Sequence, residues 1–271
     1  MVDVDTAPPW SKLPEPLIGA LRELARAKRL LVALDFDGTL APEVDDPLAA
    51  RALPEAKAAV LRLQAMPNTR VALVSGRSLK SLIAVADVPD SVLLVGSHGI
   101  ELRLDNAEAE VSLDTAELRQ VGALNLVLGE IADSVDQVWL EPKPAGFALH
   151  TRLATEANSR LAHLVALKEV LEEVDDITVR EGKNVLEFSV RSTTKGEALE
   201  HLRLYTAADA VFFAGDDLTD EDAFAALTAD DVGVKSGEGS TLANFRVPGP
   251  TQVARVIALL ADLRDGDVHE Q

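Results

Sequence analysis

The stretch LVALDFDGTLAP, residues 31–42, places four apolar residues directly before two aspartates, Asp35 and Asp37. The apolar run is typical of a strand that is buried on both faces, as in a parallel sheet. Such a strand should not end in two carboxylates unless a cation lies there, because an unpaired buried charge is costly. Gly38 indicates a sharp turn of the backbone at this point. We therefore expect a positively charged partner at this strand end.

Composition narrows the class of protein. The chain has 271 residues, 47% of them hydrophobic, which is enough for one large domain or two small ones. It has no cysteine, which excludes disulfides, thiol catalysis and cysteine–zinc sites. The net charge of -19 argues against nucleic acid as a partner. No window has the roughly 18 apolar residues of a membrane span, so we expect no membrane partner.

The first 16 residues, MVDVDTAPPWSKLPEP, contain early acids and four prolines but no apolar run. This pattern does not match a signal peptide, so we expect a flexible tail on a soluble, cytoplasmic protein. We also expect a monomer whose partner is a small molecule.

Apolar runs alternate with amphipathic segments through both ends of the chain. The expected strands are residues 29–35, 69–76, 91–99, 210–217 and 231–237, and the expected helices include residues 53–66, 78–86, 195–205, 220–227 and 251–263. Leu17, Leu21 and Leu24 have helical spacing before the first strand. This order predicts an α/β fold with a Rossmann-like parallel sheet covered by helices on both faces.

The middle of the chain has a different pattern. Residues 116–132 and 155–174 are expected helices, and the segments QVWLE, FALHTR, DITVR and NVLEFSV alternate between apolar and polar residues. In the last segment, Leu186, Phe188 and Val190 share one face, and Val185, Glu187 and Ser189 share the other. This pattern predicts an antiparallel sheet with one face on a core and one face open.

The change of pattern predicts an inserted α+β domain. We expect a flexible tail (1–16), a core domain in two pieces (17–108 and 192–264) and an inserted cap domain (109–191).

Ligands of an open parallel sheet bind beyond the carboxyl ends of its strands. Those ends here are DFDGT (35–39), SGR (75–77), GSHG (96–99) and GDDLTDED (215–222), and TTKGE (193–197) opens a helix nearby. Taken singly, most of them have a structural interpretation as tight turns, N-caps, an acidic helix start or a solvated lysine. Together they combine carboxylates, a lysine and a hydroxyl.

The combination suits a phosphoryl group and a hard metal ion. Asp35 and Asp37 point to the same side of an extended chain, and Asp216 adds a third oxygen ligand suitable for Mg²⁺. Lys195 supplies a point charge and Ser75 a hydroxyl for the phosphate. One carboxylate can attack phosphorus, and a second can protonate the leaving oxygen and then take a proton from water.

At this point the motifs resemble a known family. DFDGT, the serine of SGR, the lysine of TTKGE and GDDLTDED, in that order, are similar to the four motifs of the haloacid dehalogenase-like phosphatases. More narrowly, roughly residues 30–260 resemble the trehalose-6-phosphate phosphatases. That likeness rests on GSHGIE (96–101), LEPKPAGFALHTR (140–152), EGKNVLEF (181–188), GDDLTDEDAF (215–224) and VKSGEGSTLANFRV (234–247).

The resemblance implies roles for the core residues. Asp35 would be the nucleophile and a metal ligand, and Asp37 the general acid/base, with its backbone carbonyl on the metal. Ser75 and Lys195 would hold the phosphoryl group, and Asp216 would be the third protein ligand of Mg²⁺. Asp217 and Asp220 would support the metal and the lysine.

The resemblance also implies a sugar-binding cap that closes as a lid. Its polar face would recognise the sugar through Glu141, Lys143, His150, Arg152, Lys183 and Glu187. Further residues of the same cleft would be Arg77, His98, Glu101 and Glu221. From the residues alone, His150 and Arg152 are two apart and would share a face of one strand, as would Glu141 and Lys143.

Two positions depart from the family pattern, and a third can interrupt a regular strand. Thr151 stands where the family usually has an aromatic residue, Val190 where proline is common, and Pro144 can disturb the strand that contains Lys143.

The implied activity is Mg²⁺-dependent hydrolysis of trehalose 6-phosphate to trehalose and phosphate through an aspartyl-phosphate on Asp35, the last step of trehalose biosynthesis. One alternative is a relative that acts on another sugar phosphate, such as a sucrose or glucosyl-glycerate phosphate. Another is a non-catalytic sugar-phosphate-binding protein, which predicts loss of Asp35, Asp37 or Lys195, although all three are present. The chain lacks the EF-hand, P-loop and HExxH patterns, which argues against those metal and nucleotide sites.

Overall fold

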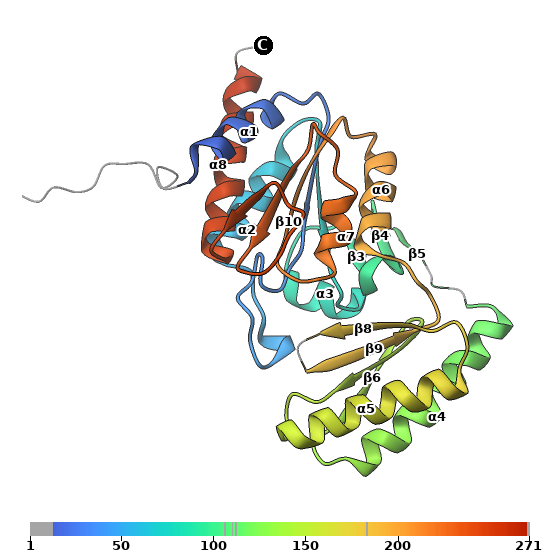
Figure 1. Ribbon diagram of the computed structural model, residues 1–271. Coiled ribbons are helices and arrows are strands. Elements are labelled where there is room, and N and C mark those ends of the chain that lie inside the picture. Colours follow the sequence, from blue (N-terminus) through green and yellow to red (C-terminus); the bar gives the residue numbers. More distant parts are fainter. Residues whose placement is uncertain (1–12, 106, 110, 112, 183, 270–271) are drawn as a thin grey trace, which may run out of the picture. The chain divides into compact units, whose positions relative to one another are not determined.

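A computed structural model describes residues 13–105, 107–109, 111, 113–182 and 184–269 (Figure 1). The chain divides into two compact units, a core unit of residues 1–109 and 194–271 and an inserted unit of residues 110–193. The core unit contains an eight-stranded sheet and the inserted unit a four-stranded sheet. Within the described ranges, the structure has no helix of the length and apolarity that a membrane span requires.

The core unit is an α/β structure. Its strands are β1 (Leu30–Leu34), β2 (Thr69–Val74), β3 (Leu93–Gly96), β4 (Glu101–Leu104), β5 (Ala107–Ala109), β10 (Ala210–Gly215), β11 (Val232–Ser236) and β12 (Phe245–Val247). Its helices are α1 (Glu15–Ala25), α2 (Pro54–Ala65), α3 (Leu79–Ala86), α6 (Lys195–Thr206), α7 (Asp220–Ala225) and α8 (Pro250–His269), with short 3-10 helices η1 (Pro47–Ala49) and η2 (Ser97–Gly99).

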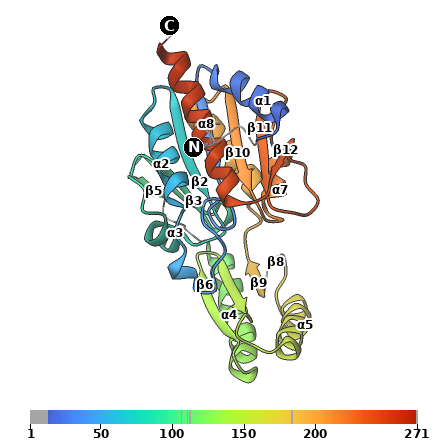
Figure 2. The same ribbon diagram turned by 90° about the vertical axis from the view of Figure 1, so that its left-hand side faces the viewer.

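The strand order is β12-β11-β10-β1-β2-β3-β4-β5, with β1 between β10 and β2 and parallel to both. All five residues of β1 are buried. Leu30, Val32 and Leu34 pack in one apolar cluster, whereas Leu31 and Ala33 pack in another. Helices α1, α2 and α8 cover the first face of the sheet, and α6 and α7 cover the second (Figures 1 and 2). The predicted α/β sandwich is therefore confirmed.

The core sheet is not entirely parallel, which corrects the expectation. Strand β4 pairs antiparallel with β3, and β5 pairs antiparallel with β4. The chain reverses at η2, where Ser97, His98 and Gly99 all have positive φ. Such a tight reversal joins neighbouring antiparallel strands without a crossover helix. These strands and β12 have three or four residues each, too few for alternation to predict them.

The expected boundary of the tail also needs correction. Helix α1 begins at Glu15, and Leu13 before it is already buried. Pro16 lies in the first turn, where a helix tolerates proline because those N–H groups have no intrahelical partner. The helical spacing of Leu17, Leu21 and Leu24 is confirmed, since all three are buried. Residues 1–12 of the expected tail lie outside the described residues.

The inserted unit is α+β, as predicted. Its elements are α4 (Thr115–Ser134), β6 (Trp139–Lys143), β7 (Gly146–His150), α5 (Glu156–Glu173), β8 (Thr178–Gly182) and β9 (Val185–Ser189). The sheet has the order β6-β7-β9-β8, and every neighbouring pair is antiparallel. Leu186 and Phe188 pack with residues of α4 and α5 in one apolar cluster, as their alternation indicates.

The opposite face of this sheet is less open than predicted. Glu187 is only 9% exposed and Ser189 only 2% exposed. Strand β9 lies between β7 and β8, so Glu187 has Ala148 and Arg180 as cross-strand neighbours. A central strand therefore shields its polar residues more than an edge strand would.

Candidate active site

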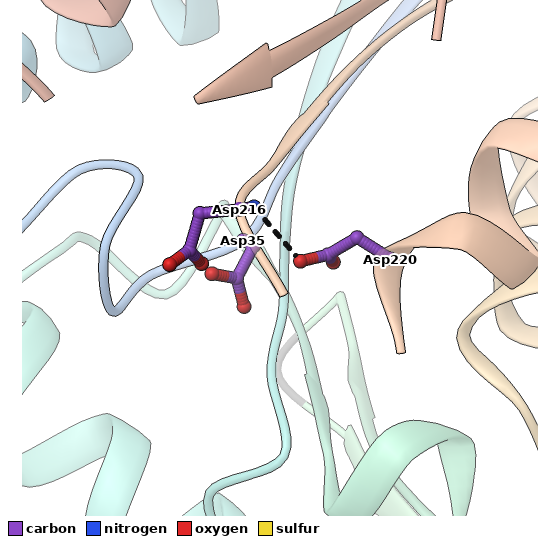
Figure 3. A group of neighbouring side chains, drawn as sticks. All are labelled: Asp35, Asp216 and Asp220. Carbon is purple, nitrogen blue, oxygen red and sulfur yellow. Dashed lines mark hydrogen bonds between the residues drawn. The ribbon is translucent and has the colours of Figure 1, made fainter. Parts of the chain in front are cut away.

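The first group of site residues lies at the carboxyl ends of β1 and β10. Asp35 extends β1 by one residue, because its N–H donates to the carbonyl of Ala214 at 2.9 Å. Asp216 directly follows β10. Since the two strands are parallel neighbours, their ends bring these aspartates side by side (Figure 3).

Asp35, Asp216 and Asp220 form an acidic cluster, in which carboxylate oxygens of all three lie within 4.8 Å of one another. Asp220 comes from the first turn of α7. The ammonium of Lys195, the first residue of α6, donates to Asp35 Oδ1 at 2.8 Å and to Asp220 Oδ1 at 2.7 Å. Lys195 is 2% exposed, so its charge is neutralised by these carboxylates rather than by water.

Both carboxylate oxygens of Asp220 accept hydrogen bonds from within the core unit. Its Oδ1 accepts from Lys195, and its Oδ2 accepts the backbone N–H groups of Asp216 and Asp217 at 3.0 and 2.9 Å. Figure 3 shows the bond from Asp216. The exposed Asp217 carboxylate accepts from the N–H of Leu218 at 2.7 Å. Asp220 therefore shapes the loop that presents Asp216 and anchors the lysine.

The charge balance of the cluster perturbs its pKa values. Burial raises the pKa of Asp35 well above its usual value, Lys195 offsets this in part, and Asp220 and Asp216 raise it again. Burial, followed by the charge of Asp220, raises the pKa of Asp216 to about 7. Burial alone would lower the pKa of Lys195, but the charges of Asp220 and Asp35 outweigh burial and raise it. Three carboxylates thus share one ammonium.

This donor set fits a hard divalent cation. Asp216 is partly buried, and burial and the neighbouring charge of Asp220 both disfavour its ionised form, which a bound cation would stabilise. Carboxylate oxygens are the ligands that Mg²⁺ prefers, and Asp35 and Asp216 have the oxygens to offer. Gly38 makes room for this arrangement, because a Cβ on it would lie 1.9 Å from Asp216 Oδ2 and its φ is +72°.

Asp37 and Arg77 form a bidentate ion pair. Arg77 Nε donates to Asp37 Oδ2 at 2.6 Å, and Nη2 donates to Oδ1 at 2.7 Å. Ser75, at the end of β2, is 2% exposed and its hydroxyl oxygen accepts the N–H of Arg77 at 3.1 Å. The structure thus ties the SGR segment to the DFDGT segment.

His98 lies in η2, the turn after β3, and Glu101 is the first residue of β4. The Glu101 carboxylate accepts the N–H of Leu79 at 2.8 Å and the hydroxyl of Ser97 at 2.7 Å. The His98 ring lies so close to Gly76 that a Cβ there would be 2.5 Å from it. Both residues therefore hold the β3 turn against the start of α3.

Glu221 joins α7 to the segment after β11. Its carboxylate accepts from Lys235 Nζ at 3.3 Å and from the N–H of Leu242 at 2.7 Å. Lys235 also donates to the carbonyl of Asp217 at 3.3 Å and is 4% exposed. Sequence reasoning did not select Lys235, although a lysine in the short apolar segment DVGVKSG was a usable signal.

The second group of site residues lies on the inserted unit's sheet. Glu141 Oε1 accepts from Lys143 Nζ at 3.0 Å, and Glu141 Oε2 lies 2.7 Å from His150 Nε2. Burial would raise the pKa of Glu141, but the His150 hydrogen bond and the Lys143 charge outweigh it and lower the pKa to about 2. Register pairs Glu141 with Ala148 and Ala148 with Glu187, which places both glutamates on one face.

The same face carries a residue that sequence reasoning missed. Trp139 is the cross-strand partner of His150, and their rings stack at 4.9 Å between centroids. A tryptophan two residues before Glu141 on an alternating strand was the available signal.

Arg152 and Lys183 were both expected on the polar face of this sheet. Strand β7 ends at His150, and Arg152 lies in the turn that follows, so the expectation that both share a strand is wrong. The chain turns directly after Thr151, because the N–H of Ala154 donates to the carbonyl of Thr151 at 3.0 Å. Lys183 lies outside the described residues.

The other two irregular positions are accommodated. Strand β6 stays regular through Lys143 and stops before Pro144. Val190 packs against the apolar cluster of the unit.

Known proteins are similar to this chain in sequence. The family model described as trehalose-phosphatase matches residues 33–248. The bifunctional trehalose-6-phosphate synthase/phosphatase of Thermoproteus tenax is 35% identical over 237 residues, which cover 83% of this chain and 31% of that protein. The trehalose-phosphate phosphatase of Mycobacterium avium is 34% identical over 248 residues, 85% of this chain and 62% of the relative. The chain thus spans less than two thirds of either relative.

Solved structures agree on the fold. The C-terminal domain of the Candida albicans trehalose-6-phosphate phosphatase superposes with a TM-score of 0.77 at 23% identity, covering 91% of this chain and 96% of that chain. The Aspergillus fumigatus trehalose-6-phosphate phosphatase gives a TM-score of 0.65 at 25% identity, covering 90% and 97% of the two chains.

Proposed function

The chain belongs to the trehalose-phosphatase family, and we propose that it hydrolyses trehalose 6-phosphate to trehalose and phosphate, the final step of trehalose biosynthesis. The observation that carries this proposal is the buried contact of Lys195 with Asp35 and Asp220 beside Asp216. A structural ion pair would need one acid for one lysine. An excess of buried carboxylate around a lysine suits a site that receives a metal ion and a phosphoryl group.

Asp35 is the proposed nucleophile. Its carboxylate oxygen attacks phosphorus, a new O–P bond forms, and the bond from phosphorus to the sugar oxygen breaks with its electron pair on that oxygen. Asp37 donates a proton to the departing oxygen. Lys195 already contacts Asp35 Oδ1 and is placed to neutralise charge on the phosphoryl group.

In the second half of the reaction, water attacks the aspartyl-phosphate. The water oxygen bonds to phosphorus, the Asp35–phosphorus bond breaks, and the electron pair returns to the Asp35 carboxylate. Asp37 now takes the proton of the water, which restores both residues.

The resident metal ion in this proposal is Mg²⁺, held by the carboxylates of Asp35 and Asp216 and by the backbone carbonyl of Asp37. When bound it would neutralise charge on the phosphoryl oxygens and on the acidic cluster. Asp220 keeps its role of orienting Lys195 and the Asp216 backbone.

Sugar recognition is assigned to the polar face of the β6-β7-β9-β8 sheet. Glu141, Lys143, His150 and Glu187 offer hydrogen-bond donors and acceptors of the kind that sugar hydroxyls need. Trp139 adds an aromatic surface on the same face. The names of the relatives support a trehalose phosphate as the substrate.

The test is phosphate release in the presence of Mg²⁺ from trehalose 6-phosphate, sucrose 6-phosphate, a glucosyl-glycerate phosphate, glucose 6-phosphate and an aryl phosphate. We expect trehalose 6-phosphate to exceed the other sugar phosphates by orders of magnitude in kcat/KM. A clear preference for another sugar phosphate would keep the chemistry and replace the substrate. Absence of phosphate release from all five would favour a binding protein.

A further inference from the structure

The ion pair of Asp37 and Arg77 has a geometry that fixes the orientation of the Asp37 carboxylate. Both carboxylate oxygens of Asp37 accept N–H groups from one guanidinium, at 2.6 and 2.7 Å. A planar, two-pronged contact of this kind sets the rotation of the carboxylate as well as its position. Both oxygens of Asp37 therefore serve as acceptors in this one contact.

Arg77 is itself held by other parts of the core unit. Its Nη1 donates to the carbonyl of Pro47 at 2.8 Å and to the hydroxyl of Ser81 at 3.2 Å. Its guanidinium lies 5.9 Å from the centroid of the Phe36 ring, and its side chain is only 11% exposed. Four of the five guanidinium N–H groups are thus in use. An arginine bound this way is better suited to orienting Asp37 than to holding a sugar.

We propose that Arg77 is a positioning residue that holds the Asp37 carboxylate in the orientation in which it takes the proton from the attacking water. This inference rests on the proposed function, because it assigns Arg77 to the second half of that reaction. In that step the water oxygen bonds to phosphorus, the bond between phosphorus and Asp35 breaks with its electron pair on Asp35, and the water proton passes to Asp37.

The competing interpretation, in which Arg77 is a substrate ligand, makes a different kinetic prediction. Loss of a sugar or phosphate ligand raises KM for the substrate and slows the first half of the reaction. With a substrate whose leaving group needs no proton, loss of a group that orients Asp37 slows only the second half, in which Asp37 takes the proton of the water. The two halves can be separated with p-nitrophenyl phosphate, because nitrophenolate departs without needing a proton.

The experiment is rapid-mixing kinetics of Arg77→Met with p-nitrophenyl phosphate and Mg²⁺. We expect a burst of about one nitrophenolate per active site, followed by a steady-state rate on the order of 100-fold below that of the wild type. Asp37→Asn should behave in the same way, and the double variant should lose little more than either single variant. Guanidinium chloride at millimolar concentration should accelerate the slow phase of Arg77→Ala, since it restores the missing group.

Two further variants test whether the effect is specific to Arg77 and to its guanidinium group. Arg70→Met is the matched control, because Arg70 also lies in the core unit and pairs with an aspartate, Asp105, outside the acidic cluster; it should keep wild-type kinetics. Arg77→Lys keeps the positive charge but not the planar, two-pronged guanidinium, so it should fold like the wild type and still show the burst.

The inference is overturned if Arg77→Met and Arg77→Lys keep the wild-type steady-state rate, or if they lose the burst and raise KM, while Asp37→Asn is slow. In that case the wild type still turns over and the proposed function stands. If the wild type releases phosphate from no monoester, the proposed function fails and the inference fails with it.

Discussion

Two clusters of charged side chains, one in each unit, differ in the balance between their carboxylates and their cations. In the core unit, Asp35, Asp216 and Asp220 share the single ammonium of Lys195. In the inserted unit, the Glu141 carboxylate is held by both Lys143 and His150. Burial, followed by the charge of Asp220, raises the pKa of Asp216 to about 7, whereas the His150 hydrogen bond and the Lys143 charge outweigh burial and lower the pKa of Glu141 to about 2.

The difference shows what each group still needs. The core cluster has more buried negative charge than the chain neutralises, so a cation and an electrophilic phosphoryl group stabilise it. The Glu141 group is already neutralised and offers oriented donors and acceptors to an uncharged partner such as a sugar. The following predictions test this contrast, from the largest expected effect to the smallest.

The largest effect is expected from Asp35→Asn. An amide cannot serve as the nucleophile, so kcat should fall by about four orders of magnitude or more. The variant should fold, because asparagine has the same shape and loses only a buried charge. Phosphate release and thermal melting measure both properties, and a variant that keeps a tenth of the wild-type activity would remove Asp35 from this role.

Asp216→Asn should have opposite effects on activity, which needs the metal, and on the stability of the metal-free protein. We expect phosphate release to fall about 100-fold or more, because the metal loses a carboxylate ligand. In EDTA at pH 8 the same change should stabilise the protein on the order of 1 kcal/mol, because it removes a poorly neutralised buried charge. Mg²⁺ should raise the melting temperature of the wild type far more than that of the variant. Equal Mg²⁺ stabilisation of both proteins would place the ion elsewhere.

Glu141→Gln and Glu187→Ala should affect substrate choice. We expect kcat/KM for trehalose 6-phosphate to fall about 10- to 100-fold, because a hydrogen-bonding group for the sugar is lost. Hydrolysis of an aryl phosphate, which has no sugar, should change less than about twofold. Parallel losses on the two substrates would take these glutamates out of sugar recognition.

The smallest effect is a pair of opposite pH dependences of stability. The folded-state pKa of Asp216 is about 7 against an ordinary 3.8, so the metal-free folded protein binds more protons in this interval. Stability should therefore fall as the pH rises from about 4 to 7. Glu141, with a pKa of about 2 against an ordinary 4.5, contributes stability above pH 4.5 that is lost as the pH falls towards 2.

Urea unfolding in EDTA measures these two dependences. Subtracting the curves of Asp216→Asn and Glu141→Gln from that of the wild type isolates each group from the other acids of the chain. Difference curves with the same sign of slope would contradict the contrast between the two groups.

Much of the fold could be predicted from local sequence. Strands β1, β2 and β10 are nearly continuous apolar runs, and each precedes a helix, so the α/β core was evident. The α+β insertion was evident from the alternation around Phe188. The strands β4, β5 and β12 could not be predicted, because their short segments pair only through the edges of a sheet that other segments build.

The residue types of the candidate site could be predicted from the sequence, whereas fewer of the contacts between them could. A strand that ends in acid is a local signal, so Asp35, Asp37 and Asp216 could be found. The buried Lys235 was missed because its partners, the carbonyl of Asp217 and the Glu221 carboxylate, lie in a different element. Arg152 was misplaced because the chain turns between Thr151 and Ala154, directly after the strand ends.

The sequence by itself determined which residue types lie at the strand ends, because the order of apolar runs, glycines and acids is a property of neighbouring residues. Only the tertiary structure decided which of them meet. Lys195 contacts an aspartate 160 residues away, and Arg77 contacts Asp37, 40 residues away. Such pairings depend on strand order and register across the sheet, which bring distant residues within hydrogen-bond distance and so set the charge balance of each group.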